Sequence, residues 1–293
     1  MAISRIRGLA AILSVIAGVD EEDSATYNQP SSIPNYTNAL NRDGLAGKRI
    51  GVPRLLFRED VAPIPSSIMA AFEGALLAMR ALGAVVVDPA NLPSTDELIG
   101  SKKEGKMFAA DMKTGLKAYF DSLAEIPSGV RTMADLVKFN DDHPELEGGV
   151  GQRTLINAEA SDGFSDEDRA YLREIGGTRG IDATLKEHNL DALVFPVAGL
   201  ADTIGAAAVA GYPIITVPLG FLPDDTTAKL QDSTLYYPAP GLPYGVAYTG
   251  AAWSEFQLIE IAYAYEQETK TRLKRLAYPE AVPRTQLRDA MNG

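Results

Sequence analysis

Two histidines and two pairs of adjacent serines are the first side chains in this 293-residue chain to test for acid–base or nucleophilic chemistry. His143 lies in the acidic stretch DDHPELE, where carboxylates could suggest a metal, but the spacing matches no known ligand pattern. His188 falls at the end of an expected helix, where an imidazole stabilises the negative terminus. We therefore expect structural roles for both histidines and predict no metal site.

The serine pairs are Ser31-Ser32 in QPSSIP and Ser66-Ser67 in IPSSIM. Either could supply a nucleophile if a lysine kept neutral by burial took the hydroxyl proton. Neither pair is flanked by glycine, which an exposed turn that binds an oxyanion would need. We expect a turn at the first pair and a helix cap at the second, at Ser66 or Ser67.

Common catalytic motifs are absent from the sequence. It contains no G-x-S-x-G, H-E-x-x-H, G-x-x-x-x-G-K-[ST] or G-x-G-x-x-G. No motif therefore indicates one of the usual hydrolase, metalloprotease, nucleotide or dinucleotide sites. We assign no catalytic residue and no cofactor.

Composition limits the classes of function further. The chain is 46% hydrophobic and 23% charged, which is typical of a folded globular protein. Its net charge of -12, without a stripe of Lys and Arg, argues against binding to nucleic acid. With no cysteine, the chain cannot form disulfides, thiolate zinc sites or a cysteine nucleophile.

Strands and helices alternate along the sequence, which predicts an α/β fold in one domain, 1–293. The expected strands cover residues 48–53, 84–87, 191–195, 214–221 and 244–249. The first two strands flank a helical pattern that Gly83 ends, and together they predict a right-handed parallel βαβ unit. Two or three helices in 96–140 should cover one face of the sheet.

Two further helices have marked ends. Ser165 precedes three acidic residues and should cap a helix that continues, after a dip at Gly176, to His188. Ser254 and Gln257 have capping-box spacing at the start of the last helix, which Pro279 should end.

The segment Met1–Val19 could be a secretion signal, because two arginines precede an apolar run. The run is too short to cross a bilayer, which needs about 20 residues. Its apolar residues form two helical faces, Ile6/Leu9/Leu13/Ile16 and Ile12/Val15/Val19. This pattern favours a helix buried nearly all round, no membrane association and a cytoplasmic location.

Three stretches together resemble the amidase signature family of serine amide hydrolases. The strongest is PGLPYGVAYTGAAWSEFQLIEIAYAYEQETKTR, residues 240–272, which resembles the last strand and helix of that family. The stretch DALVFPVAGLADTIGAAAVAGYPIITVPLGF, residues 191–221, resembles the preceding strands and turn, and the N-terminal helix with GKRIGVPR resembles the segment after the catalytic core. The resemblance implies an α/β/α arrangement around a mixed sheet.

The resemblance also implies that the catalytic part is missing. Full-length members carry a lysine and two serines in an upstream glycine-serine-rich loop, and this sequence contains no Gly-Ser-Ser. The N-terminal helix then resembles an internal helix of a longer enzyme. For substrate binding we single out residues that follow strands, where open α/β sheets hold ligands: Asp202, Thr203, Gly205, Gly211, Tyr212 and Pro213. Alternatively, 205–211 only allows close helix packing and Tyr212 belongs to the core.

Three functions remain open at this stage. The first is an amidase-family chain without intrinsic catalysis, which would act on a small-molecule amide if an upstream half completed it. The second is a non-catalytic binding or assembly subunit completed by a separate partner, with possible self-association. The third is an independent small-ligand receptor, which should melt at higher temperature when its ligand is bound.

Overall fold

The strand β3 (Ala192–Val197) lies at the centre of a five-stranded sheet of order β2-β1-β3-β5-β4 in this computed structural model, which describes residues 5–147, 151–198, 203–231, 235–276 and 279–281. The other strands are β1 (Arg49–Gly51), β2 (Val85–Val87), β4 (Ile214–Phe221) and β5 (Pro243–Thr249). β1 runs parallel to β2 and β3, whereas β5 runs antiparallel to β3 and β4. The mixed sheet confirms the predicted α/β class.

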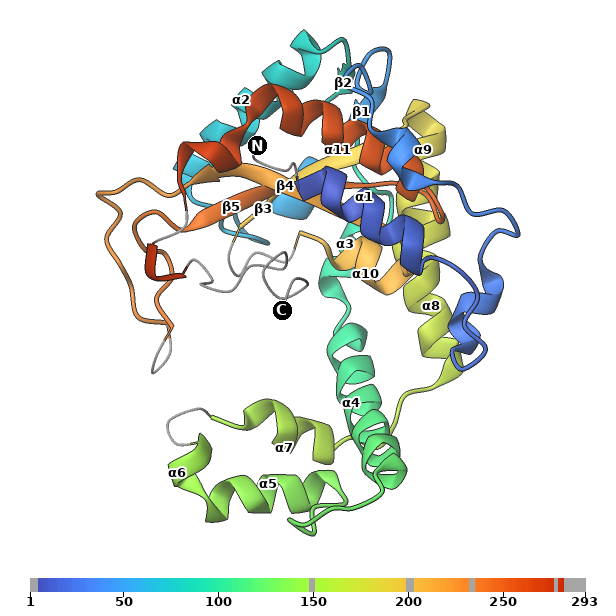
Figure 1. The fold of residues 1–293 in the computed structure, drawn as a ribbon, viewed down its shortest axis with the longest axis vertical. Coiled ribbons are helices and arrows are strands. Elements are labelled where there is room, and N and C mark those ends of the chain that lie inside the picture. Colours follow the sequence, from blue (N-terminus) through green and yellow to red (C-terminus); the bar gives the residue numbers. More distant parts are fainter. Residues whose placement is uncertain (1–4, 148–150, 199–202, 232–234, 277–278, 282–293) are drawn as a thin grey trace, which may run out of the picture.

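Helices flank this sheet, with α2 and α11 on one side and α10 on the other (Figure 1). The longer helices are α1 (Arg5–Ile16), α2 (Ser66–Ala81), α4 (Lys103–Ser122), α5 (Met133–Asp142), α8 (Asp166–Gly176) and α11 (Glu255–Thr269). The shorter ones are α3 (Thr95–Gly100), α6 (Pro144–Glu147), α7 (Arg153–Glu159), α9 (Asp182–His188) and α10 (Gly205–Ala210). Apolar residues of all five strands or their flanks, with α1, α2 and α11, share one core.

The predicted βαβ unit is confirmed. Ile50 of β1 lies opposite Val86 of β2 and Ala192 of β3, all in parallel register. Gly83 follows the end of α2 with φ of 90°, a left-handed conformation that glycine adopts without strain. The serine cap is wrong, because α2 begins at Ser66 itself and the capping position is held by Pro65, which makes no side-chain cap.

Ser165 caps α8 as predicted, since its side chain accepts a hydrogen bond from the Asp168 N–H. The dip at Gly176 is a π-helical turn, 177–181, that joins α8 to α9, which ends at His188. Extra residues in such a turn let the helix change direction without losing its backbone hydrogen bonds.

The expected capping box of α11 does not form. Gln257 instead donates a 2.6 Å hydrogen bond from Nε2 to Oδ1 of Asp191, whose other oxygen accepts the Arg49 N–H at 2.7 Å. The Ser254 hydroxyl is buried without a partner. The carboxylate thus ties α11 to the starts of β1 and β3, a tertiary contact that outweighs the local cap. The helix ends at Thr269, ten residues before Pro279, where Lys270 turns left-handed with φ of 47°.

The expected cover of the sheet by 96–140 is also wrong. Helices α4, α5 and α7 pack on one another and on α8, and Figure 1 shows them extending away from the sheet. We call α4 to α7 the helical lobe. Its helices bury Ala110, Met133 and Ala158, one residue each on α4, α5 and α7, and the ion pair Arg169–Asp111 joins α8 to α4.

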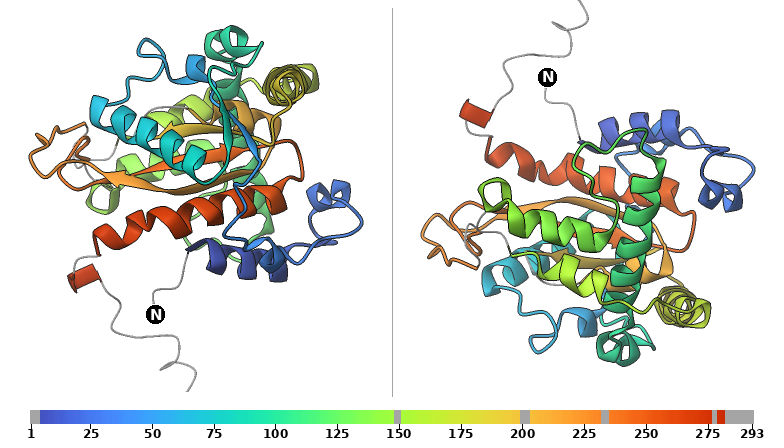
Figure 2. Two further views of the ribbon diagram at one scale, coloured as in Figure 1. Left: turned by 90° about the horizontal axis from the view of Figure 1, so that it is seen from above. Right: turned by 90° about the horizontal axis from the view of Figure 1, so that it is seen from below.

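Helix α1 is buried on one face only. Ile6 and Ala10 are buried, and the Ser14 hydroxyl accepts the Tyr36 N–H at 2.9 Å. These contacts fix α1 beside α11, as both views of Figure 2 show. The expected burial nearly all round is wrong for this chain, because one set of apolar side chains is open to solvent: Leu9, Ile12, Val15, Ile16 and Val19. No helix of the described segments is long and apolar enough to span a membrane.

Replacing Tyr248 with phenylalanine should stabilise the protein. The Tyr248 ring is fully buried in an edge contact with Tyr265 at 6.3 Å, yet its hydroxyl has no hydrogen-bond partner. A buried hydroxyl without a partner costs about 1–3 kcal/mol in lost hydration, so Tyr248→Phe should raise the free energy of unfolding in urea by about 1 kcal/mol. Tyr212→Phe is the matched control: its hydroxyl donates to Asp182 at 2.6 Å, and its removal should lower stability. Equal losses for both variants would contradict this prediction.

Candidate functional site

Two cavities lie beyond the carboxyl ends of the parallel strands β1 and β3, the position at which open α/β sheets usually bind ligands. The first, which we call the strand-end cavity, has a volume of about 310 Å³. It lies between segments 56–61, 98–104 and 203–209, with Leu172 of α8. The second, the loop cavity, has a volume of about 870 Å³ and lies between 57–69, Ala198, residues 229–231 and the pair Tyr237-Pro238.

Polar groups of the strand-end cavity are Asp60, Ser101, Glu104 and Thr203. Asp60 forms an ion pair with Arg58 at 2.9 Å, and the Ser101 hydroxyl accepts the Lys103 N–H at 3.2 Å. These side chains offer oxygen acceptors for the N–H groups of a small amide. Among the described residues that line this cavity, no hydrogen bond joins a hydroxyl group to a basic side chain.

The loop cavity was not predicted from the sequence. The hydroxyl of Tyr237 is buried without a hydrogen-bond partner, and burial raises the pKa of Tyr237. Lys229 lies on the same wall. The sequence signals there are the proline-rich stretch YYPAPGLPYG, 236–245, and the two prolines in 63–65, which mark loops but do not indicate what the loops face.

The structure brings Thr203 and Gly205 to the strand-end cavity. Thr203 is buried, and its hydroxyl donates to the Pro196 carbonyl at 2.8 Å, which holds the chain close to the end of β3. Gly205 is the first residue of α10. Asp202, also predicted to bind substrate, lies outside the described residues.

The other three predicted residues lie at the far end of α10. Gly211 ends that helix with φ of 71°, and Pro213 lines a different, apolar groove and accepts the Thr249 hydroxyl at 2.8 Å. The Tyr212 hydroxyl donates to Asp182 at 2.6 Å. Burial and this hydrogen bond raise the pKa of Tyr212 to about 12. These contacts agree with the packing alternative, and a substrate role for the three residues stays a prediction.

Small residues let α8 and α10 approach closely. A Cβ on Gly176 would lie 2.5 Å from the Ala206 carbonyl oxygen, and one on Gly177 would lie 3.0 Å from the Tyr212 hydroxyl. The run of alanines in 205–211 therefore has a packing function, whatever else it does.

Neither histidine lines one of the two cavities, and neither serine pair is hydrogen-bonded to a base. His143 ends α5, where its Nδ1 lies 3.0 Å from Glu145, and His188 is the last residue of α9. Ser31-Ser32 is exposed, and Ser66 begins α2 at the rim of the loop cavity. Among the described residues no hydrogen bond joins a lysine Nζ to a serine hydroxyl, and no group of three acidic or histidine side chains is placed to hold a metal.

Comparison with known proteins identifies the family of this chain. The family model described as Amidase matches residues 3–259. The chain belongs to the amidase family. The match includes α1, the whole sheet and the start of α11, so the amidase assignment rests on nearly all of the fold described above.

Amidase relatives match the chain over most of its length but only over half of theirs. An amidase relative of Arthroderma benhamiae is 33% identical, covering 94% of this chain and 47% of its own. The crystal structure of a peptide amidase from Stenotrophomonas maltophilia superimposes with a TM-score of 0.73 at 36% identity, covering 91% of this chain and 52% of that one. A relative of Acinetobacter baumannii, named as one of the subunits of glutamyl-tRNA(Gln) amidotransferase, is 26% identical, covering 92% of this chain and 54% of its own.

High pH should destabilise the protein through the half-buried Tyr212. Because folding raises its pKa from 10.0 to about 12, Tyr212 contributes stability that is complete below pH 10 and is lost as the pH rises through about 12. Wild type should therefore lose more free energy of unfolding than Tyr212→Phe between about pH 9 and about pH 11. Urea unfolding of both proteins at each pH measures this difference. Parallel losses would show that Tyr212 does not titrate as its environment indicates.

Adding a methyl group at the contact between α8 and α10 should destabilise the fold. Gly176→Ala places a Cβ against backbone atoms, and overpacking of this kind costs about 1–3 kcal/mol. Gly115→Ala on α4 is the matched control, since a Cβ there meets no atom within 4 Å. It should raise stability by about 0.5–1 kcal/mol through the higher helix propensity of alanine. Thermal unfolding of both variants tests the contact, and an unchanged Gly176→Ala would refute it.

Proposed function

We propose that this chain is the C-terminal portion of an amide hydrolase of the amidase signature family, acting on small-molecule amides only when an upstream half completes it. The observation that carries the proposal is the length match: the chain covers 47% of the A. benhamiae relative and 52% of the peptide amidase. Two further features support it, namely the lack of Gly-Ser-Ser in the sequence and of a lysine–serine pair among the described residues.

Within this proposal the strand-end cavity is the substrate side of the site. Thr203 and Gly205 line it, and carboxylate and hydroxyl oxygens can accept hydrogen bonds from a substrate amide. The catalytic lysine and serines implied by the family resemblance would come from the upstream half. The role of this half is then to shape and orient, because an oriented amide needs less reorganisation before attack.

A second candidate is a non-catalytic subunit that is completed by a separate chain. It is favoured by the exposed apolar face of α1, and the A. baumannii relative is itself named as a subunit of an amidotransferase. A cytoplasmic location, the lack of nucleic-acid binding and the single domain stay predictions.

The purified 293-residue chain should not hydrolyse amides. Peptide amides and aryl amides should be turned over no faster than in a mock preparation from cells without the gene, because no described serine has a base. Product release measured by mass spectrometry gives the rate. Turnover that copurifies with the chain would overturn the proposal.

The intact mass of the protein from its native source separates the two candidates. A mass well above 31.3 kDa would indicate a longer enzyme that should itself be assayed for hydrolysis. A mass near 31.3 kDa would favour the subunit that needs a separate partner.

A further inference from the structure

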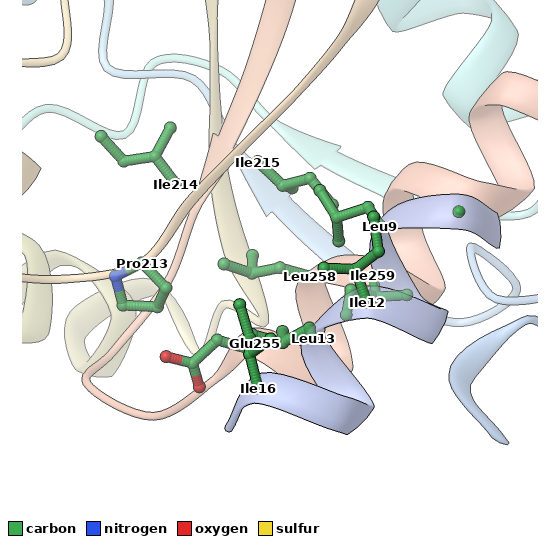
Figure 3. Close-up of a pocket in the computed structure, with 11 residues that line it drawn as sticks. Leu9, Ile12, Leu13, Ile16, Pro213, Ile214, Ile215, Glu255, Leu258 and Ile259 are labelled. Carbon is green, nitrogen blue, oxygen red and sulfur yellow. The ribbon is translucent and has the colours of Figure 1, made fainter. Parts of the chain in front are cut away.

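The cavities of the described chain differ in the charge of their walls. Figure 3 shows the apolar groove between α1, α11 and the start of β4, where Glu255 is the only charged residue among the described residues of the lining. The loop cavity, in contrast, is lined by one cation, Lys229, and by one anion, Glu59. Of these two, the loop cavity is therefore the one that can recognise an anionic ligand.

The loop cavity also has the size and lining of a site for a small molecule. Its volume of about 870 Å³ lies within the range of about 300–1,000 Å³ that is usual for ligand sites. Most of the lining is apolar, and an apolar cluster of Ile68, Ala198 and Leu222 packs against Tyr237 at its base. A ligand with an extended apolar part therefore fits this cavity best.

The loop cavity adjoins the strand-end cavity. Val61 lines both of them. After β3, Ala198 lines the loop cavity and Thr203 lines the strand-end cavity. One elongated ligand can therefore occupy both, with an amide group among the oxygen acceptors of the strand-end cavity and its other end in the loop cavity.

Lys229 is held at the wall of the loop cavity by the segment that connects β4 to β5. Its N–H donates to the Pro238 carbonyl at 3.0 Å, and its own carbonyl accepts the Tyr237 N–H at 2.8 Å. The Gln231 side chain donates from Nε2 to the Tyr237 carbonyl at 2.5 Å. Figure 1 shows this segment beyond the end of the sheet, between β4 and β5. These hydrogen bonds fix the backbone from which the Lys229 side chain extends.

The Lys229 ammonium has no ion pair and no hydrogen bond among the described residues, and none joins it to Glu59. Three lysines that line other cavities are each paired with a carboxylate: Lys113–Glu159, Lys117–Asp121 and Lys138–Asp142. In a chain of net charge -12, an unpaired cation beside a cavity is an exception. Its three N–H donors are available to a carboxylate of a ligand.

The opposite wall adds to the preference for an anion. Helix α2 has 16 residues and begins at Ser66 on the rim of the cavity, with no acidic residue in its first turn. The start of a helix carries partial positive charge. Glu59 on this wall opposes an anion, but its side chain is exposed and water screens its charge.

We propose that the loop cavity binds the carboxylate-bearing end of an elongated amide, with the carboxylate at Lys229 and the amide group in the strand-end cavity. The proposal rests on the proposed function for the amide group, whereas the preference for an anion rests on Lys229 and α2. A monoamide of a dicarboxylic acid with a flexible apolar chain is a ligand of this class. Lys229 is then a residue that determines specificity.

The test compares two probes of equal length, suberic acid monoamide and suberic diamide, which differ in the charge of one end. Isothermal titration calorimetry on the full chain at low ionic strength should show that the monoamide binds about fivefold more tightly, which is the scale of one exposed ion pair. Lys229→Met keeps most of the apolar stem and should remove this preference. Glu59→Gln should increase it by about twofold, because the opposing charge is lost.

Lys186→Met on α9 is the matched control, because Lys186 is also exposed, lines neither cavity and forms no ion pair among the described residues. It should leave the preference unchanged, and thermal unfolding checks that all variants fold. A preference that depends on Lys229 but not on Lys186 supports the proposal. No binding of the monoamide, equal binding of both probes by wild type, or a preference that survives Lys229→Met would overturn it. Because binding is measured without turnover, its failure leaves the proposed hydrolysis to be decided by its own assay.

Discussion

The pairing of β3 with a parallel strand on one side and an antiparallel strand on the other is the constraint on which the rest of this fold depends. β1 and β3 point their carboxyl ends the same way, and both polar cavities lie there. β5 reverses direction and carries β4 to the edge of the sheet. Asp191, just before β3, accepts both the Arg49 N–H and the Gln257 side chain, so one carboxylate ties the starts of β1 and β3 to α11.

The two ends of the molecule differ in polarity. The described residues of the strand-end cavity offer oxygen acceptors, whereas of those that line the groove by α1 only Glu255 is charged. The chain spans about half the length of the amidase relatives that it matches. The small-residue contact of α8 with α10 shows that a sequence feature suited to ligand approach can equally serve helix packing.

Features set by short-range patterns were predictable from the sequence. Residues 192–195 are continuously apolar and lie in the doubly buried strand β3, and Ser165 caps its helix as its acidic neighbours indicated. Features decided by distant contacts were not. Gln257 binds Asp191 in place of the local capping box, and the pattern of 96–140 predicted helices without indicating which surface they cover. The apolar faces of α1 could be recognised in the sequence. An apolar face shows that burial is favourable, but it does not show which element covers it. The loop cavity depends on the position of the loop that contains Tyr237, which no sequence pattern predicts.

The helical lobe has a consequence for the dynamics of the chain. Its helices contact each other and α8, and α4 contributes only Ala110 to the buried interior. A unit with so few buried apolar contacts opens at lower free energy than the sheet to which it is attached. Its backbone amides should therefore exchange with deuterated solvent through local opening. The amides of β3 and β5 should exchange only when the whole protein unfolds. Such a unit can also change in length or sequence during evolution at little cost to the sheet.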